Sequence, residues 1–178
     1  MTSLNSPSLH SSASAQQPAQ YLTFMLGREV FALGILAIKE IIEYGNVTQV
    51  PMMPDWICGV INLRGAVVPV MDMAARFGRT PSAITRRTCI VIVEVAASDA
   101  RHIVGVLVDA VNEVLEIPPS DVEPAPSFGA RIRADFIHSM GKVNGRFVII
   151  LDPDRVLSVD ELASIADPSE AAPLAASA

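Results

Sequence analysis

The hydrophobic residues of this chain come in short runs separated by turn-forming residues, a pattern typical of β-strands. The predicted strands are residues 21–26, 30–33, 66–71, 88–95, 102–108 and 146–151. Gly27-Arg28-Glu29 and residues 96–101 are interpreted as turns that join two of these pairs into hairpins. Because the apolar residues are often continuous rather than alternating, we expect strands that are buried on both faces, or closed into small barrels.

Helical signals are few and short, which makes the predicted fold mainly β. The predicted helical segments are residues 72–77, 153–157 and 159–166. Asp152 and Pro153 supply a helix cap followed by proline at the first helical position. Ser158 followed by Glu161 is a capping-box pattern for a short C-terminal helix.

The two ends of the chain differ in composition from its middle. Residues 1–19 and 167–178 are rich in Ser, Ala and Pro and hold too little apolar surface to offset the cost of ordering. We therefore expect both ends to be disordered, and residues 20–166 to form the ordered domain.

An internal repeat runs through the ordered part. Residues 38–43 match residues 111–116 at an offset of 73, and residues 65–72 match residues 145–152 at an offset of 80. Chance similarity between apolar strands is the alternative explanation. The repeat predicts two similar halves, roughly 20–80 and 88–157, each a small barrel of about five strands. The seam between two such halves is the expected place for a binding groove.

Composition and charge exclude several classes of protein. The chain is 51% hydrophobic and only 5% aromatic, so aliphatic side chains must build the core. A net charge of −6 argues against a nucleic-acid binder, and Arg86-Arg87 with Arg131 and Arg133 are too sparse to form a basic face. No secretory signal and no apolar run of membrane-spanning length is visible, so we expect a cytoplasmic protein without membrane insertion.

The usual signals of catalysis and of metal or cofactor binding are missing from the sequence. There is no phosphate-binding glycine loop and no nucleophile elbow, and His10, His102 and His138 stand alone. Asp109 and Glu113 would share one face of a strand and are interpreted as solvated carboxylates at strand edges. We therefore expect no enzyme activity, no cofactor and no metal. A small enzyme or ligand-binding barrel is the contrasting hypothesis, and it would need convergent polar groups.

The two cysteines, Cys58 and Cys89, both lie in apolar runs. They could form one bridge, but free thiols in a reducing compartment are the favoured interpretation. Two cysteines are also too few for a cysteine-based zinc site.

The stretch Asn62-Leu63-Arg64-Gly65 predicts a tight hairpin turn, with positive φ supplied by Asn62 and Gly65 and with Arg64 at the tip. Gly59, inside the preceding strand, indicates a bulge or a close backbone approach. Ordinary turn chemistry is one interpretation, and an arginine that grips a partner's carboxylate or carbonyl groups is the other. The repeat-related turn, residues 142–145, keeps the glycine and lacks the arginine, which favours a functional role for Arg64.

Residues 59–65, Gly-Val-Ile-Asn-Leu-Arg-Gly, and the following residues 67–72 resemble the CheW family of chemotaxis coupling proteins, and the resemblance covers about residues 20–165. It implies two SH3-like five-stranded barrels and a non-catalytic adaptor. Such an adaptor joins the cytoplasmic tips of chemoreceptors (methyl-accepting chemotaxis proteins) to the regulatory domain of the histidine kinase CheA. Rings with the kinase domain, and with further CheW copies, would organise arrays at membrane-bound receptor clusters. The same role in a pathway that controls pili or second messengers is the alternative.

The resemblance also implies which residues contact the receptor. They are Ile38, Glu40, Gly59, Arg64, Gly105, Val111 and Val114. Ile38 and Val111 are repeat-related, so we expect the two lips of the seam to come from equivalent strands. Kinase contact is expected on apolar barrel-end surfaces, one per barrel, without an assignment of side chains. Cys58 departs from the polar residue or lysine expected beside the receptor site.

Overall fold

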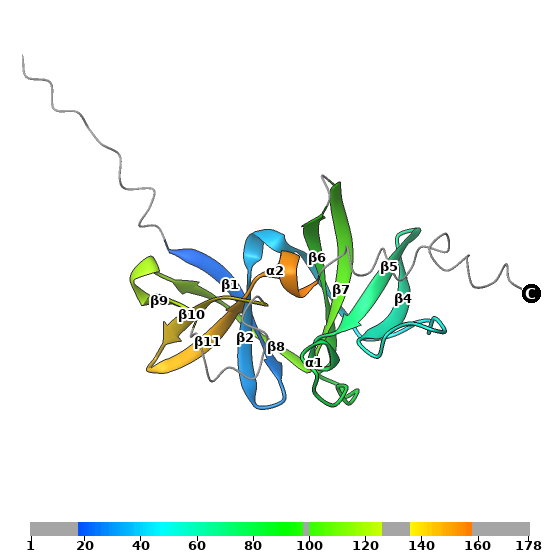
Figure 1. Ribbon diagram of the computed structural model, residues 1–178, viewed down its shortest axis with the longest axis horizontal. Coiled ribbons are helices and arrows are strands. Elements are labelled where there is room, and N and C mark those ends of the chain that lie inside the picture. Colours follow the sequence, from blue (N-terminus) through cyan, green and yellow to red (C-terminus); the bar gives the residue numbers. More distant parts are fainter. Residues whose placement is uncertain (1–17, 98–99, 126–135, 158–178) are drawn as a thin grey trace, which may run out of the picture.

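The computed structural model describes residues 18–97, 100–125 and 136–157, which fold into two β-sheets that lie side by side (Figure 1). The strands are β1 (Ala19–Leu26), β2 (Glu29–Gly34), β3 (Ile38–Glu43), β4 (Ile57–Leu63), β5 (Ala66–Asp72), β6 (Cys89–Ala97), β7 (Ala100–Val108), β8 (Ala110–Ile117), β9 (Val122–Pro124), β10 (Ile137–Val143) and β11 (Arg146–Leu151). The helices are α1 (Met73–Arg76) and α2 (Pro153–Val156), with 3-10 turns at Ile35–Ala37 and Pro119–Asp121. The mainly β prediction is confirmed. The predictions for residues 1–17 and 158–178, including the helix at 159–166, lie outside the described residues.

Each sheet contains one hairpin that comes from the other half of the chain. One sheet has the strand order β8-β1-β2-β11-β10-β9, and the other has the order β3-β6-β7-β5-β4. The β1–β2 hairpin therefore joins strands from the second half of the chain, while β6–β7 joins strands from the first half. The contiguous halves predicted at 20–80 and 88–157 do not coincide with the sheets, because each repeat gives its first hairpin to the other.

The strand registers agree with the offsets of the repeat. Each sheet contains one parallel pair, in which Val70 lies opposite Gly105 and Ile150 lies opposite Ala32. Val70 and Ile150 are 80 residues apart, and Ala32 and Gly105 are 73 apart, as in the sequence match. The two sheets are therefore equivalent arrangements of equivalent strands.

The largest hydrophobic cluster lies between the sheets. Phe24 and Phe31 come from one sheet and Val91 and Val106 from the other, and all four side chains are fully buried. Alternate residues of the same strands, such as Ile90, point to a second cluster enclosed by the five-stranded sheet. The central strands are thus buried on both faces, which explains their continuous apolar runs.

The seam between the sheets is consequently filled, and the binding groove predicted there is not an open channel. The rings of Phe24 and Phe31 stack with centroids 6.2 Å apart, and Phe77 extends this group to Phe136 at 6.1 Å. Each fully buried side chain of this kind contributes about 1.5–3 kcal/mol through removal of apolar surface from water. Any partner must bind at the margins of the seam and not within it.

Short helix α2 fastens one sheet to the other and lies between them in Figure 1. Asp152 caps its first turn, as predicted, by accepting a hydrogen bond from the amide of Asp154 at 3.1 Å. The carboxylate of Asp154 then accepts from the amide of Ala96 on β6 at 3.0 Å. Arg76 donates from Nε to the carbonyl of Val156 at 3.0 Å and stacks over Trp56 at 4.6 Å.

Gly59 allows the five-stranded sheet to close on itself. The segment after β3 returns beside β4, where Thr48 and Val60 exchange backbone hydrogen bonds of 2.8 and 2.9 Å. A side chain at Gly59 would overlap the Thr48 carbonyl, and the residue has φ of 148° at a register shift between Ile57 and Gly59. Both the bulge and the close approach predicted for Gly59 are confirmed.

Replacement of Gly59 tests this closure. We expect Gly59→Ala to lower the free energy of unfolding by about 3 kcal/mol, because a strained φ and the displaced Thr48 carbonyl add together. Gly27→Ala is the matched control, since Gly27 has φ of 62° but open space around it, and should cost about 1 kcal/mol. Urea unfolding followed by Trp56 fluorescence measures both. Equal losses in the two variants would contradict the steric argument.

Candidate functional site

The turn between β4 and β5 presents Arg64 in a left-handed backbone conformation. Arg64 and Gly65 have φ of 52° and 88°, the signature of a two-residue hairpin turn. The expectation that Asn62 supplies a positive φ is wrong. Its side chain instead accepts a hydrogen bond from the Gly65 amide at 2.8 Å. In the repeat-related turn the position of Arg64 is held by Asn144, also at φ of 52°, and asparagine tolerates this conformation better than arginine.

The Arg64 guanidinium is held by an ion pair across the end of the five-stranded sheet. Its Nη2 lies 2.8 Å from Oε2 of Glu40 on β3. The Arg64 side chain remains 78% exposed while that of Glu40 is 26% exposed. Such a surface pair adds at most about 1 kcal/mol to stability, so its main effect is to fix the direction of the guanidinium.

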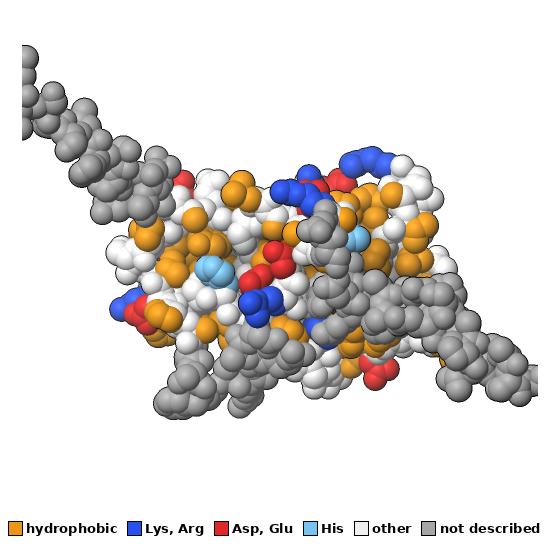
Figure 2. All heavy atoms as spheres, turned by 45° about the horizontal axis from the view of Figure 1, so that its top comes forward, with side chains coloured by type: hydrophobic (Ala, Val, Ile, Leu, Met, Phe, Trp, Pro, Cys, Tyr) orange, Lys and Arg blue, Asp and Glu red, His pale blue; other side chains and the backbone are white. Residues whose placement is uncertain are grey.

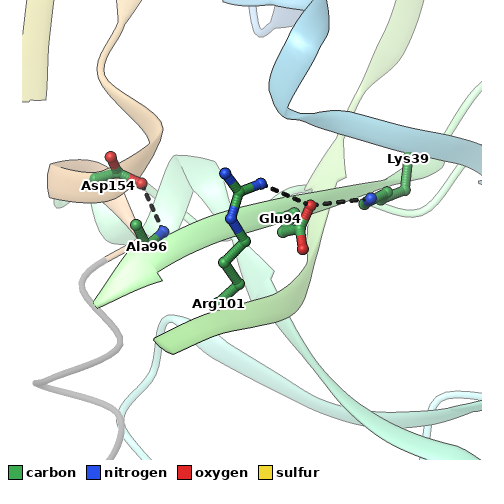
Figure 3. A network of polar contacts seen from close by, with 5 residues as sticks. All are labelled: Lys39, Glu94, Ala96, Arg101 and Asp154. Atoms are coloured by element: carbon green, nitrogen blue, oxygen red, sulfur yellow. Dashed lines mark hydrogen bonds and ion pairs between the residues drawn. The ribbon is translucent and has the colours of Figure 1, made fainter. Parts of the chain in front are cut away.

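A second charged network includes Lys39 of β3 and is drawn in Figure 3. Lys39 Nζ lies 2.9 Å and Arg101 Nη1 lies 3.4 Å from Oε2 of Glu94. The hydrogen bond from Lys39 is the main reason why the pKa of Glu94 falls below its ordinary value. A lowered carboxyl pKa means that the pairing stabilises the fold above the ordinary glutamate pKa and is lost as pH falls through the lowered value. Sequence reasoning missed this network, since only the β3–β6 register brings Lys39 to Glu94.

Ile38 and Val111 occupy equivalent places at the margin of the packed seam. Both side chains are partly buried against the cluster between the sheets, one from β3 and one from β8. Three residues further on, Ile41 and Val114 are 43% and 46% exposed. The repeat-related pair therefore marks two matching strand margins where the core reaches the surface.

Gly105 lies inside the five-stranded sheet and not on its surface. A Cβ placed there would lie 2.9 Å from Ile90 Cγ2 and 3.3 Å from Val70 Cγ2. Of the seven residues expected at the receptor, the structure joins Glu40 and Arg64 directly. It buries Gly59 and Gly105, so these two glycines serve the shape of the barrel.

Both cysteines are free thiols and half-buried, so the alternative of a bridge between them is not formed. Burial, assisted by the nearby charge of Asp72, raises the pKa of the Cys58 thiol to about 12. Cys58 packs against the cluster enclosed by the five-stranded sheet. A cysteine in place of the polar residue or lysine expected at position 58 therefore affects the barrel interior more than the exposed surface around Arg64.

Each barrel ends in an exposed apolar side chain two residues after its turn glycine. Val67 on β5 is 73% exposed, and Phe147 on β11, 80 residues later, is 54% exposed. Phe147 borders a hollow of about 720 Å³ that Val30 and Leu115 also line. Kinase contact on apolar barrel-end surfaces stays a prediction, and Val67 and Phe147 are candidate side chains for it.

The described residues hold no group of three or more His, Cys, Asp or Glu side chains placed to bind a metal ion. None of the helices in that part of the chain is long and apolar enough to cross a membrane. On the face shown in Figure 2, charged side chains form a few small groups among apolar ones, without a broad basic surface.

Comparison with known proteins gives one consistent family. A sequence model of the CheW-like domain matches residues 20–161. The chain is 31% identical to the chemotaxis protein CheW of Klebsiella aerogenes over 82% of this chain and 86% of that protein. It is 34% identical to CheW of Bacillus subtilis over 76% of this chain and 85% of that protein.

A solved structure is similar over most of its length. The scaffolding protein TtCheW from Thermoanaerobacter tengcongensis superposes with a TM-score of 0.69 at 32% identity, over 76% of this chain and 84% of that one. The two sheets described above accordingly correspond to the two SH3-like barrels of the CheW fold. With the family match, the sequence identities and the shared fold in agreement, the chain belongs to the CheW-like family of chemotaxis scaffolding proteins.

Proposed function

We propose that this chain is a non-catalytic adaptor that couples chemoreceptors to the histidine kinase CheA in bacterial chemotaxis. The observation that carries the proposal is the exposed Arg64 guanidinium, aimed by Glu40 from a strained turn whose repeat-related counterpart has asparagine. Fold stability does not require the arginine there, so recognition of a partner is the better explanation. A guanidinium is suited to carboxylates and to the free carbonyls of a helix end.

The receptor tip lies along the margin of the seam, since the seam itself is filled. Ile38 and the exposed Ile41 supply apolar contact on β3, next to the Glu40–Arg64 pair. Val111 and Val114 offer the equivalent margin on β8. Gly59 and Gly105 act indirectly, by setting the positions of β4 and β7.

The kinase regulatory domain docks on the barrel ends marked by Val67 and Phe147. An adaptor in a ring needs two different faces, because head-to-tail contacts close into a ring only when each member offers both sides of the interface. The two barrel ends lie at repeat-related places but carry different side chains, Val67 and Phe147, so they can serve as the two faces toward kinase domains or further copies of this chain. Recruitment to membrane-bound receptor clusters then follows from receptor contact.

Arg64→Asn tests the receptor-facing role with the residue that the second repeat already uses in the same backbone conformation. We expect receptor-dependent kinase activation to fall about tenfold, as for the loss of one charged contact. Stability should change by no more than about 0.5 kcal/mol. Reconstituted receptor–kinase assemblies and thermal unfolding measure the two quantities.

Glu40→Gln tests whether the ion pair with Glu40 contributes to the role of the Arg64 guanidinium. It removes the ion pair and leaves Arg64 in place, so the loss of activation should be smaller than in Arg64→Asn. The double variant should resemble Arg64→Asn alone, because Glu40 acts through Arg64. Normal activation by Arg64→Asn would refute the assignment of this residue.

Substitution at the barrel ends tests the kinase faces. Phe147→Ser should weaken binding of the isolated CheA regulatory domain about 30-fold, since exposed aromatic anchors commonly contribute about 2 kcal/mol. Val67→Ser should weaken the second contact to a smaller extent. Titration calorimetry with each variant, and with both together, measures the two faces separately.

Leu36→Ser is the control for these variants, because Leu36 is 99% exposed but lies on neither barrel end. It should bind the kinase domain like the unchanged protein. Equal weakening in all three variants would instead indicate a general effect of surface polarity and would contradict the two faces.

A further inference from the structure

The connection between α1 and β6 is built as an ordered surface loop. Asp72 accepts hydrogen bonds from the Ser82 amide at 2.9 Å and from its hydroxyl at 3.3 Å. The Thr85 amide donates to Thr88 Oγ1 at 2.8 Å, and the Arg87 amide donates to Thr85 Oγ1 at 3.1 Å. These side-chain contacts fix the loop where no strand or helix supports it.

This ordered loop presents one apolar and two basic side chains. Ile84 is 49% exposed, and Arg86 and Arg87 are both exposed. Arg64, Arg79 and Arg101 each form an ion pair with a glutamate. Among the described residues, neither Arg86 nor Arg87 has a side-chain ion pair. A protein with a net charge of −6 therefore displays two uncompensated positive charges side by side.

The two arginines border a hollow of about 690 Å³. Its other walls are Met25 and Gly27 at the β1–β2 turn, and Asp109 with Ala110 at the β7–β8 junction. Three segments far apart in sequence thus meet around one depression. Its lining combines apolar contact, two cations and one carboxylate.

Asp109 was expected to be a solvated carboxylate, and the structure corrects this. Its Oδ2 accepts a hydrogen bond from the Gly27 amide at 2.6 Å, and its own amide donates to the Met25 carbonyl at 3.0 Å. Its Oδ1 is shielded from solvent and has no hydrogen-bond partner among the described residues. Asp109 therefore holds the β1–β2 turn in place and forms a fixed wall of the hollow.

We propose that this hollow is a further docking surface, which takes an acidic protein segment. The segment's carboxylates would pair with Arg86 and Arg87, and an apolar side chain would cover Met25 and Ala83. None of the residues assigned above to receptor or kinase lines the hollow, so the surface is independent of the proposed function.

An acidic protein segment fits better than a membrane surface or a nucleic acid. Recognition of anionic lipid typically uses clusters of about four to eight basic residues, and this surface has two. A nucleic acid would require a broad basic face, and two arginines on a chain of net charge −6 do not provide one. Guanidinium groups, by contrast, form paired hydrogen bonds with side-chain carboxylates.

The experiment uses the full ¹⁵N-labelled chain and two synthetic helical peptides. The peptides share leucine and serine positions and differ only in glutamate against lysine elsewhere. We expect the glutamate peptide to shift the amide signals of residues 84–87 and of Asp109, with weaker binding at higher salt, and the lysine peptide to leave them unchanged. Arg86→Gln with Arg87→Gln should weaken binding about tenfold.

Arg28→Gln with Arg155→Gln is the matched control, because it changes the net charge equally at exposed sites outside this hollow. It should retain the affinity of the unchanged protein. Thermal unfolding checks that each variant is folded.

Three results would overturn the proposal. They are equal binding of the lysine peptide, signal shifts confined to the Arg64 or Phe147 surfaces, and affinity that the arginine substitutions leave unchanged. Vesicles of phosphatidylcholine and phosphatidylglycerol provide the last comparison. If the chain sediments with them through Arg86 and Arg87 while neither peptide binds, the surface recognises lipid and not protein.

Discussion

Exchange of hairpins between the two repeats is the constraint on which the rest of this structure depends. The β6–β7 hairpin pairs with the strands of one barrel and packs against the other barrel. Its residues must therefore be apolar on both faces: Val91 points to the cluster between the sheets and Ile90 to the cluster inside the five-stranded sheet. The β1–β2 hairpin carries the reciprocal requirement. Each barrel thus supplies one wall of the other's core, and the pair should behave as one rigid body.

In the part of the chain that the structure describes, the centre between the sheets is filled, and the exposed apolar side chains lie at margins and turns. Ile38 and Val111 lie where the central cluster reaches the surface, and Val67 and Phe147 lie where the barrels end. The two residues of each pair lie on repeat-related strands, so the duplication places each of these two surfaces once in each half of the chain. Divergence of single residues, such as Arg64 against Asn144, can then give the two versions different partners.

Local features of this fold could be predicted from the sequence, and pairings between distant strands could not. The cap at Asp152 depends on neighbouring residues and is confirmed, and so is the close backbone approach at Gly59. Hairpin exchange was missed because either repeat's hairpin matches either barrel equally well. The Lys39–Glu94 contact was missed for the same reason, since it exists only in the register that β3 forms with β6.

The energetics of the Arg64 turn separate folding from function. A non-glycine residue in the left-handed region costs about 1–2 kcal/mol, and asparagine, as at position 144, costs less. The exposed ion pair with Glu40 stabilises the fold by at most about 1 kcal/mol. Arginine therefore does not make the turn more stable than asparagine would. The stability of the turn therefore does not account for the presence of an arginine whose side chain is 78% exposed and paired with Glu40.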